Sequence, residues 1–158
     1  MAYAVARRYS QSAMSDSVQR SRSFAGGRFS VVLASGNLQF PYCRNCNTVQ
    51  YPPTEICRQC LGDVIEIIPC VASGSVIAST RIYRSYALDF AKDGPWSVAS
   101  VKMDAGPIVF AHVLDSLVLA TSVTLVSLMD AAGDGVIGAI TNEEDVTILQ
   151  ARLTKFDG

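Results

Sequence analysis

The sequence is poor in charge and in histidine. Only 17% of its residues are charged, the formal net charge is −1, and His112 is the single histidine. A nearly neutral chain produces no global field that attracts phosphate backbones, so a nucleic-acid partner would need a local basic patch. One histidine cannot build a catalytic zinc site, and the sequence has no nucleophile elbow, phosphate-binding glycine loop or paired carboxylates around it. The chain therefore lacks a convincing active site of its own.

Long apolar runs are also missing. Asp115 interrupts the stretch from Val113 to Leu119, and no run approaches the roughly 18 residues that span a bilayer. Arg7 and Arg8 are not followed by a continuous apolar region, so neither an ordinary nor a twin-arginine export signal is predicted. We expect a soluble, cytoplasmic protein without membrane contact. In that reducing compartment, paired cysteines favour metal binding over disulfides.

Apolar residues are plentiful. They make up 49% of the 158 residues, and the mean hydropathy is +0.26. A chain of this length can form one compact domain or two small ones around a shared core. The composition indicates a buried core or a large partner interface rather than disorder.

Four of the five cysteines form two pairs, Cys43-x-x-Cys46 and Cys57-x-x-Cys60, separated by ten residues. This spacing is typical of a zinc ribbon, in which two tight turns face each other. Four thiolates at about 2.3 Å complete a tetrahedron around Zn²⁺ and leave no open position, so such a zinc is structural and does not activate water. A rubredoxin-like iron site uses similar ligands and is the remaining alternative, and free or redox-active cysteine pairs are a weaker one.

No catalytic residue is predicted. Cys70 lies in the apolar, strand-like stretch from Ile67 to Val71 and is interpreted as a buried small hydrophobic residue. His112 lies in an apolar strand and is interpreted as structural. The consecutive acids from Glu143 to Asp145 indicate a solvated turn rather than an acid and base pair.

The predicted fold class is mainly β, with an N-terminal helical or irregular segment (1–35), a zinc ribbon (36–70) and a five-stranded OB-type barrel (71–158). The start is rich in serine and arginine and carries a thin apolar stripe, which fits either a helix or a solvated tail. After Cys60, short runs rich in Val and Ile predict strands at 64–68, 76–83, 97–103, 108–114 and 123–129. The alternation in 146–153 predicts a last strand, and whether this piece or 136–140 closes the barrel is left open.

The loop from Arg84 to Trp96 gathers aromatic and charged residues between two predicted strands. Because aromatic and arginine side chains often anchor interfaces, the loop is a candidate contact surface for a partner, through Arg84, Tyr86, Phe90 and Trp96. The alternative is that two or three of these rings cap the barrel core.

Several motifs together resemble one family, the small proteins with a rubredoxin-like zinc ribbon and an OB fold that accompany thiolases and related acyl-CoA enzymes. The resemblance covers about residues 24 to 129 and is carried by Gly36 to Cys46, Tyr51-Pro52-Pro53, Cys57 to Cys60, Gly74-Ser75-Val76, and Pro95 to Val101 with Asp104 to Pro107. The run from Gly94 to Lys102 resembles versions paired with thiolases of aromatic-compound degradation, such as benzoylsuccinyl-CoA thiolase.

The resemblance implies a non-catalytic accessory subunit in a hetero-oligomer, without activity of its own. The catalytic residues and the acyl-CoA substrate would belong to a thiolase-like partner. This chain would help to shape the partner's acyl-CoA entrance, and the candidate residues for that role are Arg84, Tyr86, Phe90 and Trp96. A nucleic-acid-binding ribbon and barrel module is the alternative function, because both folds often bind single strands. The scattered Lys and Arg residues argue against it. A stand-alone acyl-CoA-binding or enzymatic subunit is the third possibility.

Overall fold

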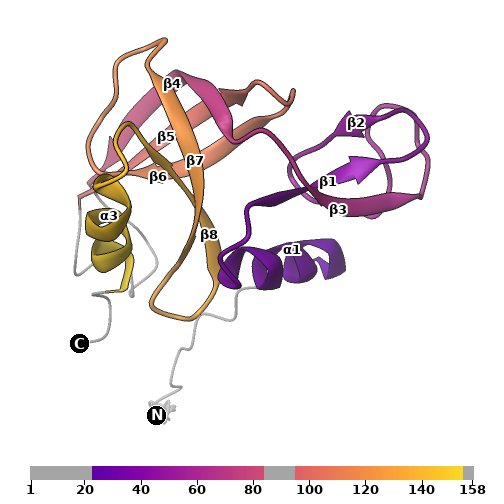
Figure 1. Ribbon diagram of the computed structural model, residues 1–158, viewed down its shortest axis with the longest axis horizontal. Coiled ribbons are helices and arrows are strands. Elements are labelled where there is room, and N and C mark those ends of the chain that lie inside the picture. The colour runs from indigo at the N-terminus through magenta and orange to yellow at the C-terminus, as the bar shows by residue number, and fades with distance from the viewer. Residues whose placement is uncertain (1–22, 84–94, 155–158) are drawn as a thin grey trace, which may run out of the picture.

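The computed structural model describes residues 23–83 and 95–154. Across these ranges a small three-stranded sheet lies beside a closed barrel, as Figure 1 shows, and helix α1 (Phe24–Ala34) lies below their junction. Helix α3 (Asp145–Thr154) lies against the opposite end of the barrel. No helix within the described ranges is long and apolar enough to cross a membrane.

The smaller sheet carries the cysteine pairs. Its strands are β1 (Gln39–Cys43), β2 (Thr48–Val49) and β3 (Ile65–Pro69), in the order β2-β1-β3. Both pairings of β1 are antiparallel, and Tyr42 lies opposite Val49 on one side and Glu66 on the other. The run predicted from the sequence at 64–68 is therefore a strand of the ribbon and not of the barrel.

The barrel consists of β4 (Ser73–Ile82), β5 (Trp96–Met103), β6 (Ile108–Val113), β7 (Ser122–Met129) and β8 (Gly135–Ile140). The order is β4-β5-β6-β8-β7, and pairing of β7 with β4 closes it. Strands β6 and β8 are parallel, whereas the other neighbours are antiparallel. This order is that of an OB-type Greek-key barrel, so the predicted fold class is confirmed.

Alternation along the strands separates two apolar clusters. The inward residues of the barrel, such as Val101, Val109 and Leu125, form the main core. Outward residues of β7 and β8 pack against α3 in a second cluster, which includes Leu128, Ile140, Leu149, Leu153 and also Trp96. Gly138 lies on this outward face, where a Cβ atom would come within 2.5 Å of Leu128 Cδ1.

The sequence-based prediction of a strand at 146–153 is wrong, because this stretch is helix α3. Its buried residues, Leu149 and Leu153, are four apart and face the barrel. That spacing places them on one side of a helix, whereas a strand would need apolar residues at every second position. The stretch at 136–140 supplies β8, the fifth barrel strand.

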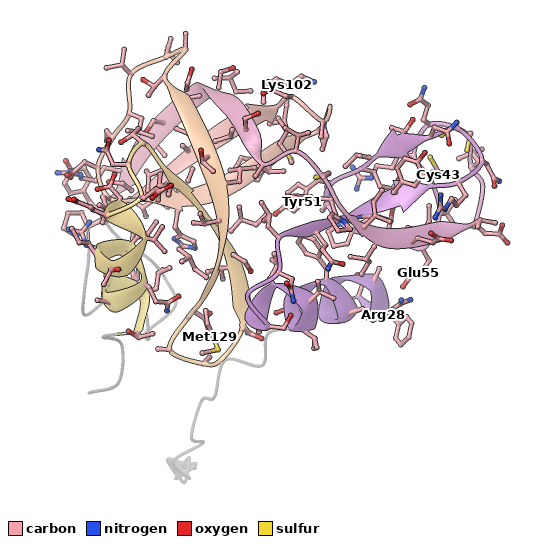
Figure 2. All side chains as sticks on the ribbon, in the orientation of Figure 1. Arg28, Cys43, Tyr51, Glu55, Lys102 and Met129 are labelled. Carbon is pink, nitrogen blue, oxygen red and sulfur yellow. The ribbon has the colours of Figure 1, made fainter. Side chains whose placement is uncertain are left out.

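Helix α1 joins the two parts of the molecule. Ser23 caps it by accepting a hydrogen bond from the Gly26 N–H at 3.1 Å. Its buried Phe29 belongs to the main core together with Phe40 of β1. The ring centroids of Phe29, Phe40 and Tyr51 lie 5.6 to 6.3 Å apart, and Figure 2 places Tyr51 between the ribbon and the barrel. One continuous core therefore links helix, ribbon and barrel.

Candidate metal centre

Two similar turns position the cysteine pairs. In the first, Cys43 ends β1 and its carbonyl accepts a hydrogen bond from the Asn47 N–H at 2.8 Å. In the second, the Cys57 carbonyl accepts from the Leu61 N–H at 3.0 Å. Asn47 and Leu61 both have positive φ, 57° and 60°, which turns the chain back after each pair. The sequence thus builds one turn twice and presents two thiols from each.

The four sulfur atoms lie in one cluster. Cys43 Sγ is 3.5 Å from Cys60 Sγ, and Cys46 Sγ is 3.6 Å from Cys57 Sγ. All four lie within 4.8 Å of one another. These distances exclude disulfides, which need about 2.05 Å. Sulfur atoms about 2.3 Å from a tetrahedral zinc ion would lie roughly 3.8 Å apart, so the cluster fits the metal.

The thiol chemistry of the cluster also fits a cation. Backbone N–H groups of Cys60 and Gln59 point at Cys57 and lower its thiol pKa to about 6. The Gly62 N–H likewise lowers the pKa of Cys60, but the neighbouring thiols, Cys46 first, together with burial raise it to about 12. Four crowded thiols cannot all ionise without a positive charge among them. A divalent cation supplies that charge, and this four-thiolate site holds structural zinc.

Gln50 links strand β1 to the second cysteine turn, a role that the sequence pattern did not predict. The residue is only 5% exposed. Its side-chain carbonyl accepts a hydrogen bond from the Arg58 N–H at 3.3 Å, and its amide donates to Thr54 Oγ1 at 3.0 Å. Its own N–H donates to the Pro41 carbonyl at 2.8 Å. Its position directly before Tyr51-Pro52-Pro53 was the available signal, but the partners become visible only in the folded chain.

An ion pair closes the outer side of the ribbon. Arg44 Nη2 lies 2.6 Å from Glu66 Oε2, and the Arg44 guanidinium also lies 5.6 Å from the ring centroid of Tyr42. The hydrogen bond from Arg44 lowers the pKa of Glu66 and raises that of the arginine. Because both side chains are about half exposed, the pair adds little to stability.

The other candidate residues lie apart from the metal cluster. Cys70 is half-buried beside the main core, and burial raises its thiol pKa, which disfavours a nucleophilic thiolate. Trp96 is only 7% exposed and belongs to the apolar cluster under α3. This position matches the alternative interpretation, in which a ring of the loop caps the barrel core. Arg84, Tyr86 and Phe90 lie outside the described residues.

His112 lies on the outward side of β6. Its ring meets Trp96 edge to face, with centroids 6.2 Å apart. Burial lowers the pKa of His112, and Asp130 opposes that shift. Its Nδ1 is buried, and the described residues offer it no hydrogen-bond partner. His112 is thus a neutral, apolar-packed histidine near pH 7.

Known proteins share this combination of parts. Residues 32–66 match the family described as "ChsH2, rubredoxin-like zinc ribbon domain". The DUF35 domain-containing scaffold protein of Methanocaldococcus jannaschii is 28% identical over 74 residues, which are 46% of this chain and 52% of that protein. The match thus spans about half the length of this curated relative. A solved structure titled "Ltp2-ChsH2(DUF35) aldolase" has a TM-score of 0.63 at 15% identity, covering 75% of this chain and 95% of that chain.

The fold and the cysteine cluster define a zinc-ribbon protein with an OB-type barrel. Within that class, the ribbon of this chain matches the ChsH2 rubredoxin-like zinc ribbon over residues 32–66, and the chain is similar to a DUF35 scaffold protein and shares the fold of the aldolase-associated structure. The family resemblance inferred from the sequence is confirmed.

Proposed function

We propose that this chain is a non-catalytic accessory subunit of a thiolase-like acyl-CoA enzyme complex. The observation that carries the proposal is the closed four-thiolate site joined to a barrel. A zinc ion with four protein ligands has no position for water or substrate, so its role is to hold the ribbon rather than to react. The relatives support the same role, since one is named a scaffold protein and another is part of an aldolase.

The acyl-CoA role is the finer part of the proposal. A cleft of about 680 Å³ between ribbon and barrel is lined by polar and apolar residues in similar measure, and its two charged side chains are Arg58 and Lys102. Two cations in one cleft suit the phosphates of a coenzyme A held mainly by the partner. Arg84, Tyr86 and Phe90, outside the described residues, are proposed as contacts with the partner or with its acyl-CoA entrance. An aromatic acyl group, as in benzoylsuccinyl-CoA, is the substrate that the sequence resemblance suggests.

Co-expression tests the proposal. The chain should co-purify in a fixed ratio with the thiolase-like or aldolase-like catalytic polypeptide encoded beside it, and acyl-CoA turnover should require that polypeptide. Turnover by the purified chain alone, lost in Cys70→Ala or His112→Ala, would contradict a non-catalytic role. Salt-dependent binding of single-stranded nucleic acid without any catalytic partner would favour the alternative module.

A further inference from the structure

The two cysteine turns carry an arginine at the same position, directly after the first cysteine of each pair. Arg44 of the first turn is neutralised by Glu66, whose carboxylate lies 2.6 Å from its Nη2. Arg58 of the second turn forms no ion pair within the described residues and lines the cleft between ribbon and barrel. Two similar turns therefore place equivalent arginines in different surroundings, and the arginine at the cleft is left available for an anion from outside the chain.

Lys102 lines the same cleft from strand β5. Its amine donates a hydrogen bond to the Gly106 carbonyl, which leaves the positive charge without a carboxylate beside it. Among the described residues that line the cleft, none is acidic. Guanidinium and ammonium groups bind phosphate through charge-assisted hydrogen bonds. The cleft with Arg58 and Lys102 therefore suits a phosphate group.

An apolar hollow of about 460 Å³ adjoins the cleft where helix α1, the Tyr51-Pro52-Pro53 turn and strand β8 meet. The rings of Phe29 and Phe110 form part of its wall, and the described lining has no charged residue, since burial lowers the pKa of His112. Tyr51, which Figure 2 places between ribbon and barrel, lines both the hollow and the cleft. The hollow suits an uncharged apolar group that continues from the cleft across the Tyr51 ring.

Strand β6 runs from the cleft to the hollow. Ile108 lines the cleft, whereas Phe110 and His112 line the hollow. These alternate residues project from one face of the strand, and the distance from Ile108 to His112 along it is roughly 14 Å. A ligand that fills both ends therefore needs an uncharged arm of that order between its anionic group and its apolar group. Inorganic phosphate or a plain hydrocarbon would fill one end alone.

We infer that the cleft and the hollow form one groove for an acyl thioester of coenzyme A, with its phosphates at Arg58 and Lys102 and its acyl group beside Phe110. Coenzyme A matches the polarity and the length of the groove, because its phosphates and its acyl group lie at opposite ends of a long uncharged pantetheine arm. An alkyl phosphate offers the same two ends without the arm. The assignment rests on the acyl-CoA part of the proposed function and deepens it, because it adds a place on this chain for the acyl group.

Calorimetric titration of the full zinc-loaded chain, without any catalytic polypeptide, tests the groove. Octanoyl-CoA carries both ends and the arm, CoA lacks the acyl chain, and octyl phosphate lacks the arm. Octanoyl-CoA should bind at least about tenfold more tightly than either, because several methylene groups are buried in addition to the phosphate contacts. Octanoyl-CoA, but not CoA, should also change the fluorescence of Trp96, whose ring centroid lies 6.2 Å from that of His112 at the hollow.

Variants at the two ends should separate the contributions of phosphate and acyl chain. Arg58→Ala should weaken octanoyl-CoA and CoA alike by about fivefold or more. Arg44→Ala is its matched control, because Arg44 is paired and does not line the cleft, and it should change either constant less than about twofold. Phe110→Ser should leave CoA binding unchanged and reduce the preference for octanoyl-CoA to less than about threefold. Phe24→Ser is the control for that variant, because Phe24 is 73% exposed and lines neither the cleft nor the hollow.

The opposite results overturn the assignment. If wild-type protein binds CoA as tightly as octanoyl-CoA, the hollow is not part of the site, and if octyl phosphate binds as tightly, the ligand is a lipid phosphate. Equal losses in Arg44→Ala and Arg58→Ala would mean a general attraction of anions. A chain that co-purifies with the catalytic polypeptide but does not bind octanoyl-CoA would refute the groove and leave the subunit role standing. A chain that binds octanoyl-CoA but forms no such complex would keep the groove and refute the subunit role.

Discussion

Cys43 and Cys57 are the most buried of the four thiols, at 0% and 1% exposed. Replacing either by serine removes one of four ligands, so bound zinc should fall well below one per chain and the ribbon should unfold at a lower temperature. Elemental analysis and a melting curve on the same sample measure both. Cys70→Ser, outside the cluster, should keep about one zinc per chain. A Cys57→Ser protein with full zinc content, or wild-type protein carrying iron, would contradict the assignment.

The pKa of His112 lies below its ordinary value because burial disfavours the charged ring, with Asp130 opposing. The unfolded chain therefore binds the proton more readily than the folded chain. Stability from this residue should be fully present above about pH 6.5 and should be lost as the pH falls through the lower folded pKa. Urea unfolding at several pH values, with His112→Gln as the reference, isolates the effect from acid release of zinc. Equal pH profiles for the two proteins would refute it.

At the residue scale, the metal ligands could be predicted from the sequence because each pair lies within one tight turn. The spacing of the two ligands in each pair is visible within four consecutive residues, so no tertiary contact is needed to recognise it. The role of Gln50 could not be predicted, since its partners Thr54 and Arg58 are brought to it by the fold of the loop. The core position of Trp96 depends on α3, more than forty positions further along the chain, and the sequence left two roles open for this ring.

At the element scale, the docking of α1 depends on one glycine. A Cβ atom on Gly135 would lie 2.2 Å from the Ser30 carbonyl oxygen and 2.4 Å from the Ala34 nitrogen, both backbone atoms of the helix. Gly135→Ala should therefore push α1 away and lower the free energy of unfolding by about 2 kcal/mol or more. Chemical denaturation measures this change.

Gly27→Ala is the matched control for that experiment. Gly27 lies within α1, and a Cβ atom there would meet nothing within 4 Å. Alanine loses less backbone entropy than glycine in a helix, so the variant should gain about 0.5 to 1 kcal/mol. If both alanine variants shift stability in the same direction, the close approach of α1 to β8 is not what fixes the helix.

The local pattern of apolar residues determines the barrel strands more fully than it determines helix α3. Strands β5, β6 and β7 contain several Val residues and alternate in burial over most of their length, so period and composition agree there. The stretch that forms α3 has Val146 and Ile148 at positions that also fit alternation. Its helical state is fixed by the contact of Leu149 and Leu153 with Leu128 and Ile140, which a local pattern does not contain.

At the scale of the whole molecule, ribbon and barrel share a core, although we propose domain bounds at 36–70 and 71–158. Phe40 of the ribbon is completely buried and belongs to the same cluster as Val101 and Val109 of the barrel. A shared core couples the two parts, because opening the ribbon exposes apolar surface that the barrel also buries. The coupling predicts one cooperative unfolding transition.

Two probes can follow that transition separately. Trp96 is the single tryptophan of the chain and reports on the barrel, while a coloured chelator that captures released zinc reports on the ribbon. In wild-type protein the two denaturation curves should coincide. Phe40→Ala removes the ring that packs on Phe29 and Tyr51, and it should destabilise the whole chain by about 3 to 5 kcal/mol and shift both curves together. Zinc release at clearly lower denaturant than the Trp96 transition in wild-type protein would mean that the ribbon unfolds alone and that the shared core does not couple the two parts.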